Sequence, residues 1–119
     1  MSSARKSDLY RVTIDALVQA CTQGSGRVGA ERVGRGIWNL NADSLGSGDS
    51  QELNALLKSL TDAQRSALAN ALVKEFEAGV YEALKVLEEN KVAPFESGYE
   101  GSPQEDFVGR LGGWQWPRN

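Results

Sequence analysis

Histidine is absent from these 119 residues, and cysteine occurs once. The missing histidine excludes Ser-His-Asp triads, Cys-His dyads, histidine-containing zinc sites and the Glu-x-x-His pairs of di-iron bundles, because each requires an imidazole. Cys21 cannot form an internal disulfide and falls at an apolar position of an expected helix, so we interpret it as a small buried hydrophobic residue. We expect no catalytic residue, no metal site and no cofactor.

Long apolar runs are also missing. No uncharged apolar stretch approaches the ~20 residues that span a bilayer, and residues 1–11 lack the apolar segment of a secretory signal. The content of 40% hydrophobic and 24% charged residues is ordinary for a globular protein, and the length fits one domain over residues 1–119. We therefore expect a cytoplasmic protein of bacterial type with no membrane partner.

The strongest pattern in the chain predicts one long helix over about residues 61–90. Thr61 and Gln64 form a capping box, in which each side chain accepts a hydrogen bond from the backbone N–H of the other residue. Asn90 suits a left-handed helix end. Apolar residues then recur at helical spacing, which requires one buried face: Leu68, Leu72, Phe76, Val80, Leu84 and Leu87. Gly79 interrupts this pattern, and it is either a bend or close contact, or a tolerated surface glycine.

Three further segments have helical patterns. After a disordered lead over residues 1–6, Ser7 or Asp8 begins a helix with an apolar stripe at Tyr10, Ile14, Leu17, Val18 and Cys21. A short leucine-rich helix begins near residues 49–50 and leads directly into the long helix. Ser102 caps a short C-terminal helix that runs to Leu111 and is stopped by Gly112 and Gly113, and its first helical residue is a proline.

The segment 23–48 is the hardest to interpret, because it contains more than half of the glycines. They are Gly24, Gly26, Gly29, Gly34, Gly36, Gly46 and Gly48. Ala30, Val33, Ile37 and Leu40 recur at helical spacing, so we expect a glycine-weakened helix over about 29–41, with a loop containing strand-like pieces as the alternative. The predicted fold is all-α, a small bundle of four to five helices around the long helix, with a short C-terminal helix and an aromatic tail.

Large aromatic side chains are concentrated near the C-terminal end. Phe107, Trp114 and Trp116 would bury large areas if they docked on the bundle, and would form a binding site if they were exposed. We select these three residues as candidate partner-binding residues. The functional hypothesis is a non-enzymatic protein that binds another protein or a second copy of itself as a homodimer, as adaptors, regulators and immunity proteins do.

The alternative hypothesis concerns arginines among the glycines. Arg27, Arg32 and Arg35 could bind a phosphate or a nucleic acid, because arginine forms bidentate hydrogen bonds and glycine permits close approach. Residues 24–29 spell G-x-G-x-x-G, but a helix precedes them, which disfavours a dinucleotide site. Residues 1–40 carry six basic and three acidic residues, whereas residues 41–119 carry seven and thirteen. The arginines could therefore simply pair with the acidic long helix.

Two other functions are disfavoured by the residues present. A helix-turn-helix over residues 50–75 would need a strongly basic face, which the chain lacks, so nucleic acid is not an expected partner. An enzyme would need a deep polar pocket, for example one that joins Tyr81 and Glu82 to Arg35. Sequence spacing alone does not assemble such a site.

Overall fold

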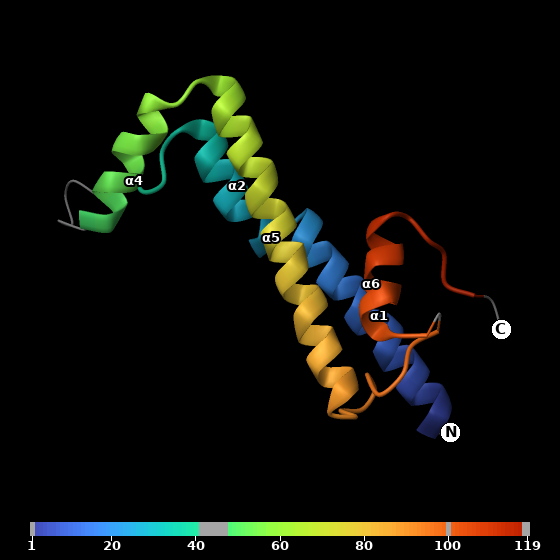
Figure 1. Cartoon of the computed structure of the whole chain (residues 1–119). Coiled ribbons are helices and arrows are strands. Elements are labelled where there is room, and N and C mark those ends of the chain that lie inside the picture. Colours follow the sequence, from blue (N-terminus) through green and yellow to red (C-terminus); the bar gives the residue numbers. More distant parts are fainter. Residues whose placement is uncertain (1, 41–47, 100, 118–119) are drawn as a thin grey trace.

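The long helix predicted from the sequence organises the molecule. The computed structural model describes residues 2–40, 48–99 and 101–117, and the regular elements in these ranges are all α-helices. They are α1 (Ser2–Thr22), α2 (Ser25–Arg35), α4 (Gly48–Ser59), α5 (Asp62–Glu89) and α6 (Pro103–Leu111). Figure 1 shows α1, α2 and α6 beside α5, whereas α4 joins the N-terminal end of α5 and points away from it. The predicted all-α bundle around one long helix is confirmed.

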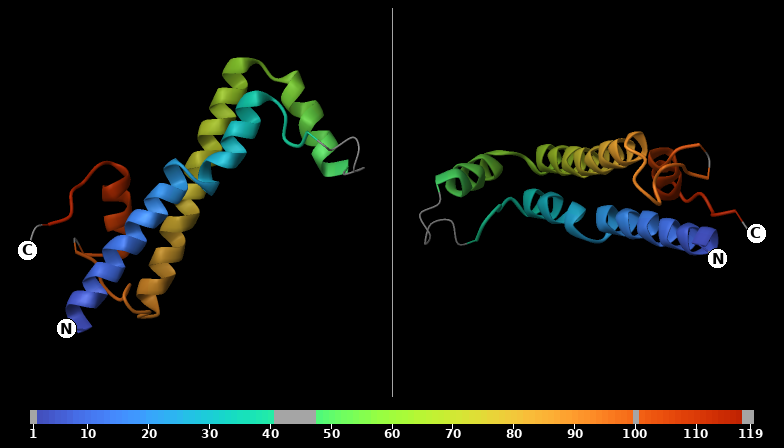
Figure 2. Two further views of the ribbon diagram at one scale, coloured as in Figure 1. Left: turned by 180° about the vertical axis from the view of Figure 1, so that it is seen from behind. Right: turned by 90° about the horizontal axis from the view of Figure 1, so that it is seen from below.

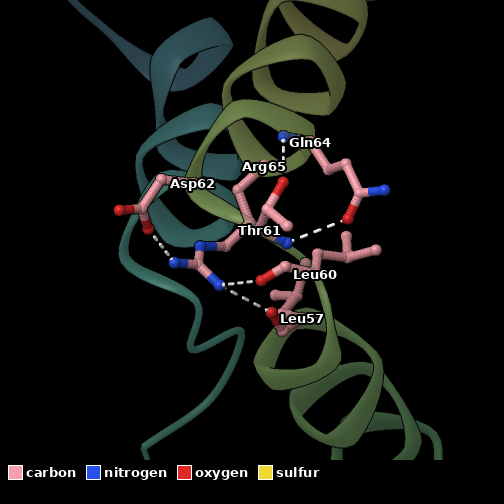
Figure 3. A network of polar contacts seen from close by, with 6 residues as sticks. All are labelled: Leu57, Leu60, Thr61, Asp62, Gln64 and Arg65. Atoms are coloured by element: carbon pink, nitrogen blue, oxygen red, sulfur yellow. Dashed lines mark hydrogen bonds and ion pairs between the residues drawn. The ribbon is translucent and has the colours of Figure 1, made fainter.

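Both ends of α5 are stabilised by side chains. Thr61 Oγ1 accepts a hydrogen bond from the Gln64 N–H at 3.1 Å, and Gln64 Oε1 accepts one from the Thr61 N–H at 2.9 Å (Figure 3). This confirms the predicted capping box. At the other end, the Asn90 side chain donates to a backbone carbonyl one turn earlier at 2.9 Å. The left-handed conformation expected at Asn90 is found instead at Lys91, with φ of 55°.

Gly79 does not bend or break α5. The helix is continuous across it, Gly79 is exposed, and no atom lies within 4 Å of the position that a Cβ would occupy. Of the two interpretations offered by the sequence, the tolerated surface glycine is therefore the correct one.

We expect the substitution Gly79→Ala to raise the free energy of unfolding by about 0.5–1 kcal/mol, because alanine restricts the unfolded chain and fits the helix without a clash. Urea unfolding followed by circular dichroism, at matched protein concentration, measures this change. A loss of stability would contradict the structure, because it would show that another group packs closely against Gly79.

The helices form two layers. In the right-hand view of Figure 2, α1 and α2 lie end to end in one layer, and α4, α5 and α6 lie in the other. The main core cluster lies between the layers, where α1 and α6 meet the C-terminal half of α5. It contains Tyr10, Ile14, Cys21, Leu84 and Phe107, each at most 3% exposed. The apolar stripe predicted for the first helix is confirmed, and Cys21 is a buried hydrophobic residue as expected.

Two helix boundaries differ from the prediction. α1 begins at Ser2 rather than at Ser7 or Asp8, because residues 2–6 contain no proline or glycine and the helix can extend beyond its packed part. α2 lies over Ser25–Arg35 rather than 29–41, because Gly36 takes the left-handed conformation (φ 78°) that ends a helix. Residues 41–47 lie outside the described residues, and α4 begins at Gly48, close to the start expected near residues 49–50.

The junction of α4 and α5 depends on Arg65. Its Nη1 donates to the backbone carbonyls of Leu57 at 3.0 Å and Leu60 at 2.6 Å, and its Nη2 pairs with Asp62 (Figure 3). Carbonyls at a helix C-terminus have no partner within the helix, so the guanidinium satisfies two of them. A Cβ on Gly36 would lie 3.5 Å from Arg65 Cδ. The ends of α2 and α4 and the start of α5 therefore meet at one side chain.

The resulting molecule is elongated. Its extents are 56 × 27 × 20 Å and its radius of gyration is 18.3 Å, whereas a compact domain of this length has a radius of gyration of about 13–14 Å. Within the described residues, no helix is both long enough and apolar enough to cross a membrane. An elongated shape leaves much apolar surface uncovered, so a binding site is expected on one of the exposed faces.

Candidate functional site

Aromatic rings gather where α1 meets the loop after α5 and the chain after α6. The C-terminal aromatic cluster consists of Tyr10, Phe95, Tyr99, Trp114 and Trp116. The Tyr10 ring centroid lies 5.7, 5.8 and 5.9 Å from those of Phe95, Tyr99 and Trp116. The Trp114 and Trp116 centroids are 5.2 Å apart with the rings at 65°. These tilted and edge-on arrangements are favourable for aromatic pairs and hold the tail on α1.

A buried carboxylate lies beneath these rings. Asp106 is 1% exposed, and its Oδ2 accepts hydrogen bonds from the Tyr10 hydroxyl at 2.5 Å and from the Tyr99 backbone N–H at 2.7 Å. The Asp106 carboxylate therefore joins α6 both to α1 and to the loop that precedes α6. Hydrogen bonds to a charged acceptor are stronger than neutral ones, and a buried carboxylate requires them.

A second carboxylate holds the tail itself. Asp15 on α1 accepts a hydrogen bond from Arg110 Nε at 2.7 Å and another from Trp116 Nε1 at 3.0 Å. The Arg110 guanidinium also lies 5.4 Å from the centroid of the Trp116 ring, within the range of a cation–π contact. These contacts bring both the end of α6 and the tail to one residue of α1.

Tyr10 is the titratable group most strongly affected by this environment. Burial, followed by the hydrogen bond to Asp106 and the charge of Asp106, raises the pKa of Tyr10 well above its ordinary value of 10.0. A raised pKa means that the folded protein holds the phenol proton more tightly than the unfolded chain. The corresponding stability is fully present below pH 10 and is lost as the pH rises above 10.

We therefore expect the free energy of unfolding to fall above pH 10, with a contribution from Tyr10 of about 1.4 kcal/mol per pH unit. Urea unfolding between pH 8 and about pH 11.5 measures the slope, and Tyr10→Phe should remove this contribution. Tyr81 and Cys21, whose pKa values are also raised, contribute to the slope that remains. An equal slope in Tyr10→Phe and in the wild-type protein would contradict this account.

The chemistry of this region is structural. Tyr10 is 3% exposed and Asp106 is 1% exposed, so neither group is open to a dissolved substrate. Cys21 is 1% exposed, and burial, followed by the charge of Glu77, raises the pKa of its thiol. A buried thiol with a raised pKa is a poor nucleophile. These groups therefore stabilise the fold.

Phe107 requires a correction. Its position near the C-terminal tryptophans predicted a partner-binding residue, but Phe107 is 0% exposed and lies in the main core cluster. It faces inward because Pro103, Asp106 and Phe107 are all buried on the same side of α6. Trp114 and Trp116 are partly buried and packed on the bundle, which corresponds to the docked alternative given for the tail.

The three candidate arginines lie on α2, in a helix and not in a loop. Arg32 is stacked at 5.5 Å from the centroid of the Trp38 ring, while Arg27 and Arg35 are exposed. Because a helix turns by about 100° and rises about 1.5 Å per residue, Arg27 lies about 140° around the helix from Arg32 and about 12 Å along the axis from Arg35. The helix thus does not direct the three side chains to a single phosphate.

An open groove of about 300 Å³ lies between α5 and α6. It is lined by Lys74, Glu77, Ala78, Tyr81, Glu82, Phe107, Val108 and Leu111. Tyr81 and Glu82 line this groove, as the enzyme hypothesis requires, but Arg35 is not among its lining residues. The Tyr81 hydroxyl donates a hydrogen bond to Glu105 at 2.8 Å. Among the described residues, no three acidic, cysteine or histidine side chains come together as a metal site.

An uncovered apolar surface on the long helix lies beside α2. We define the α2–α5 flank as Trp38, Leu68, Leu72 and Phe76. Leu68 and Phe76 are each 36% exposed. The flank is continuous, because a Cβ on Gly29 would lie 3.5 Å from the Trp38 ring and 3.8 Å from Leu72 Cδ1. Leu68 follows on the same face of α5, one turn from Leu72.

The sequence analysis did not identify this flank. Its helical spacing placed Leu68, Leu72 and Phe76 on a buried stripe, and the structure leaves the edge of that stripe open. Spacing shows which residues share a face, but it does not show how much of that face the other helices cover. The available signal was the width of the stripe, which exceeds what one narrow partner helix such as α2 can cover.

Residues 3–118 match a protein-family model that is described as a family of unknown function, DUF6547. No curated protein and no solved structure matches the chain.

Proposed function

The chain belongs to the DUF6547 family, and we propose that it acts by binding another protein chain, without catalysing a reaction. The partner binds on the α2–α5 flank. In this proposal the protein is a small cytoplasmic protein of bacterial type that works as adaptors, regulators or immunity proteins do.

The observation that carries the proposal is the exposure of apolar side chains on one continuous surface. Single exposed apolar residues are ordinary, whereas a contiguous apolar group with polar residues around it is typical of a protein-binding site. The flank combines two aromatic rings with leucines, and Arg32 lies over one of those rings at 5.5 Å. Aromatic and arginine side chains contribute the largest energies at protein interfaces.

The proposal moves the interface away from the C-terminal aromatic cluster. Trp114 and Trp116 are already used within the molecule, where they pack on each other and Trp116 also packs on Tyr10. A partner that engaged them would first have to remove the tail from α1 and break the hydrogen bond from Trp116 to Asp15. The flank requires no such rearrangement, because Leu68 and Phe76 are exposed in the folded chain and Trp38 and Leu72 are partly exposed.

Site-specific photocrosslinking tests the proposal. A benzophenone amino acid is introduced in place of Leu68 on the flank, or in place of Asn70, which is exposed and lies about 160° around α5 from Leu68. We expect illumination of living cells to give a discrete adduct from position 68 and none from position 70. The same adducts from both positions, or none from either, would overturn the proposal.

A further inference from the structure

The surroundings of the flank indicate what covers it. α2 runs antiparallel to α5, because Gly26 lies at Phe76, Gly29 at Leu72 and Gly36 at Arg65. The core cluster that joins α1, α6 and α5 lies toward the other end of the molecule. In the α2 half, two helices thus pack side by side with one apolar edge open to solvent.

We infer, on the basis of the function proposed above, that the partner is a second copy of this chain. The two α5 helices pack antiparallel across their α2–α5 flanks, with the symmetry axis near Leu72. The resulting interface contains α2 and the N-terminal half of α5 from each copy and forms a four-helix bundle. Such bundles commonly have antiparallel neighbouring helices around a shared apolar core.

The apolar part of the flank is self-complementary in this arrangement. Leu68 and Phe76 lie on opposite sides of Leu72, each four residues away along α5. In an antiparallel pair, Leu68 of one copy is therefore level with Phe76 of the other, and Leu72 meets Leu72. A symmetric dimer requires that one patch match itself in this way.

The charges at the edge of the flank are complementary in the same register. Arg32 lies three residues beyond Gly29, toward the N-terminal end of α5, because α2 is antiparallel to α5. Glu75 of the second copy lies three residues beyond Leu72. Because the second α5 is antiparallel to the first, Glu75 is displaced from the symmetry axis in the same direction as Arg32 of the first copy. Arg32 of each copy is thus level with Glu75 of the other, which gives two equivalent ion pairs.

A parallel arrangement would lose this match. It would place Arg32 level with Arg32 and Glu75 level with Glu75, and like charges at an interface oppose association. Both the apolar residues and the charges therefore favour the antiparallel pair. An unrelated partner chain would not require either match.

The first measurement is the mass of the purified full chain by sedimentation equilibrium across a concentration series. We expect a reversible dimer. Leu68→Glu places a charge opposite Phe76 of the other copy at two equivalent points of the interface and should raise the dimer dissociation constant by about a hundredfold or more. The matched control, Asn70→Glu, adds the same charge to an exposed position about 160° around α5 from Leu68 and should leave the constant within about twofold.

Charge reversal then tests the register. Arg32→Glu alone and Glu75→Arg alone should each raise the dissociation constant by roughly tenfold, because two attractive pairs become repulsive. An equimolar mixture of the two variants should form a heterodimer with near wild-type affinity. In that heterodimer one copy supplies two arginines, the other supplies two glutamates, and both ion pairs are restored. Both positions lie on the surface of single helices, so neither change is expected to unfold the chain.

The outcomes separate this inference from the function on which it rests. A wild-type chain that stays monomeric at about 100 µM, together with a crosslink from position 68 to a different protein, would overturn the self-association and leave the binding function intact. A dimer that is unaffected by Leu68→Glu, or variants that do not restore each other when mixed, would also overturn it. If no crosslink were specific to position 68, both the self-association and the proposed binding function would be overturned.

Discussion

Asp106→Ala is expected to lower the free energy of unfolding by about 3–5 kcal/mol. The substitution removes the acceptor of the Tyr10 hydroxyl and of the Tyr99 N–H, which lie 2.5 and 2.7 Å from the carboxylate. Tyr10 is only 3% exposed, so water cannot replace the lost bond without opening the structure. An unsatisfied buried donor costs about 1–3 kcal/mol, and a cavity adds to this cost.

The neighbouring residue provides the control. Glu105 also lies in the first turn of α6, but it is exposed and accepts a hydrogen bond from Tyr81. Glu105→Ala should cost less than about 1 kcal/mol. Urea unfolding of both variants measures the difference, and equal losses would contradict the role given to Asp106. Gly98→Ala gives an independent check, because its Cβ would lie 2.6 Å from Asp106 Oδ2 and should also destabilise the protein strongly.

The parts of the fold that the sequence predicted are those encoded by local signals. The capping box at Thr61 and the Ser102 cap of α6 both involve residues three positions apart, and both are present. The apolar stripe of α1 follows from helical spacing, and its central residues Tyr10, Ile14 and Cys21 are buried. Such signals require no knowledge of the rest of the chain.

The errors in the glycine-rich segment have a different origin. Gly36 ends α2 because it takes a left-handed conformation with its backbone beside Arg65. That neighbour is 29 residues away in the sequence, so periodicity gave no sign of it. Leu40, which the helical spacing included, is 76% exposed outside the helix. Glycine permits several conformations, and the tertiary contact selects among them.

The candidate site could be predicted only in part. The aromatic residues near the C-terminal end were recognised, but their partners Asp15 and Tyr10 lie about a hundred residues earlier, and only the fold brings them together. Phe107 was assigned to a binding surface because aromatic residues are common at interfaces as well as in cores. Whether such a residue faces a core or a partner depends on the helices that cover it, and the sequence does not specify them.

Two glycines on α2 should respond in opposite ways to the same substitution. Gly26 is buried at the joint between α1 and α2, where a Cβ would lie 2.8 Å from Phe76 Cδ1, 2.9 Å from Cys21 Cα and 3.0 Å from the Ala20 carbonyl oxygen. The Phe76 side chain can move, but the other two atoms belong to the backbone of α1. Gly26→Ala therefore forces the helices apart, and we expect a loss of about 2–3 kcal/mol.

Gly34 lies on the same helix, is exposed and has no atom within 4 Å of the position of a Cβ. Gly34→Ala should raise the free energy of unfolding by up to about 1 kcal/mol, because alanine is the better helix former. Urea unfolding of the two variants under identical conditions measures the contrast. If Gly26→Ala were also stabilising, the close approach of α1, α2 and Phe76 would be wrong, because helix propensity alone would then explain both changes. Opposite signs would instead locate the requirement for glycine at the joint, where the backbone of α1 leaves no room for a side chain.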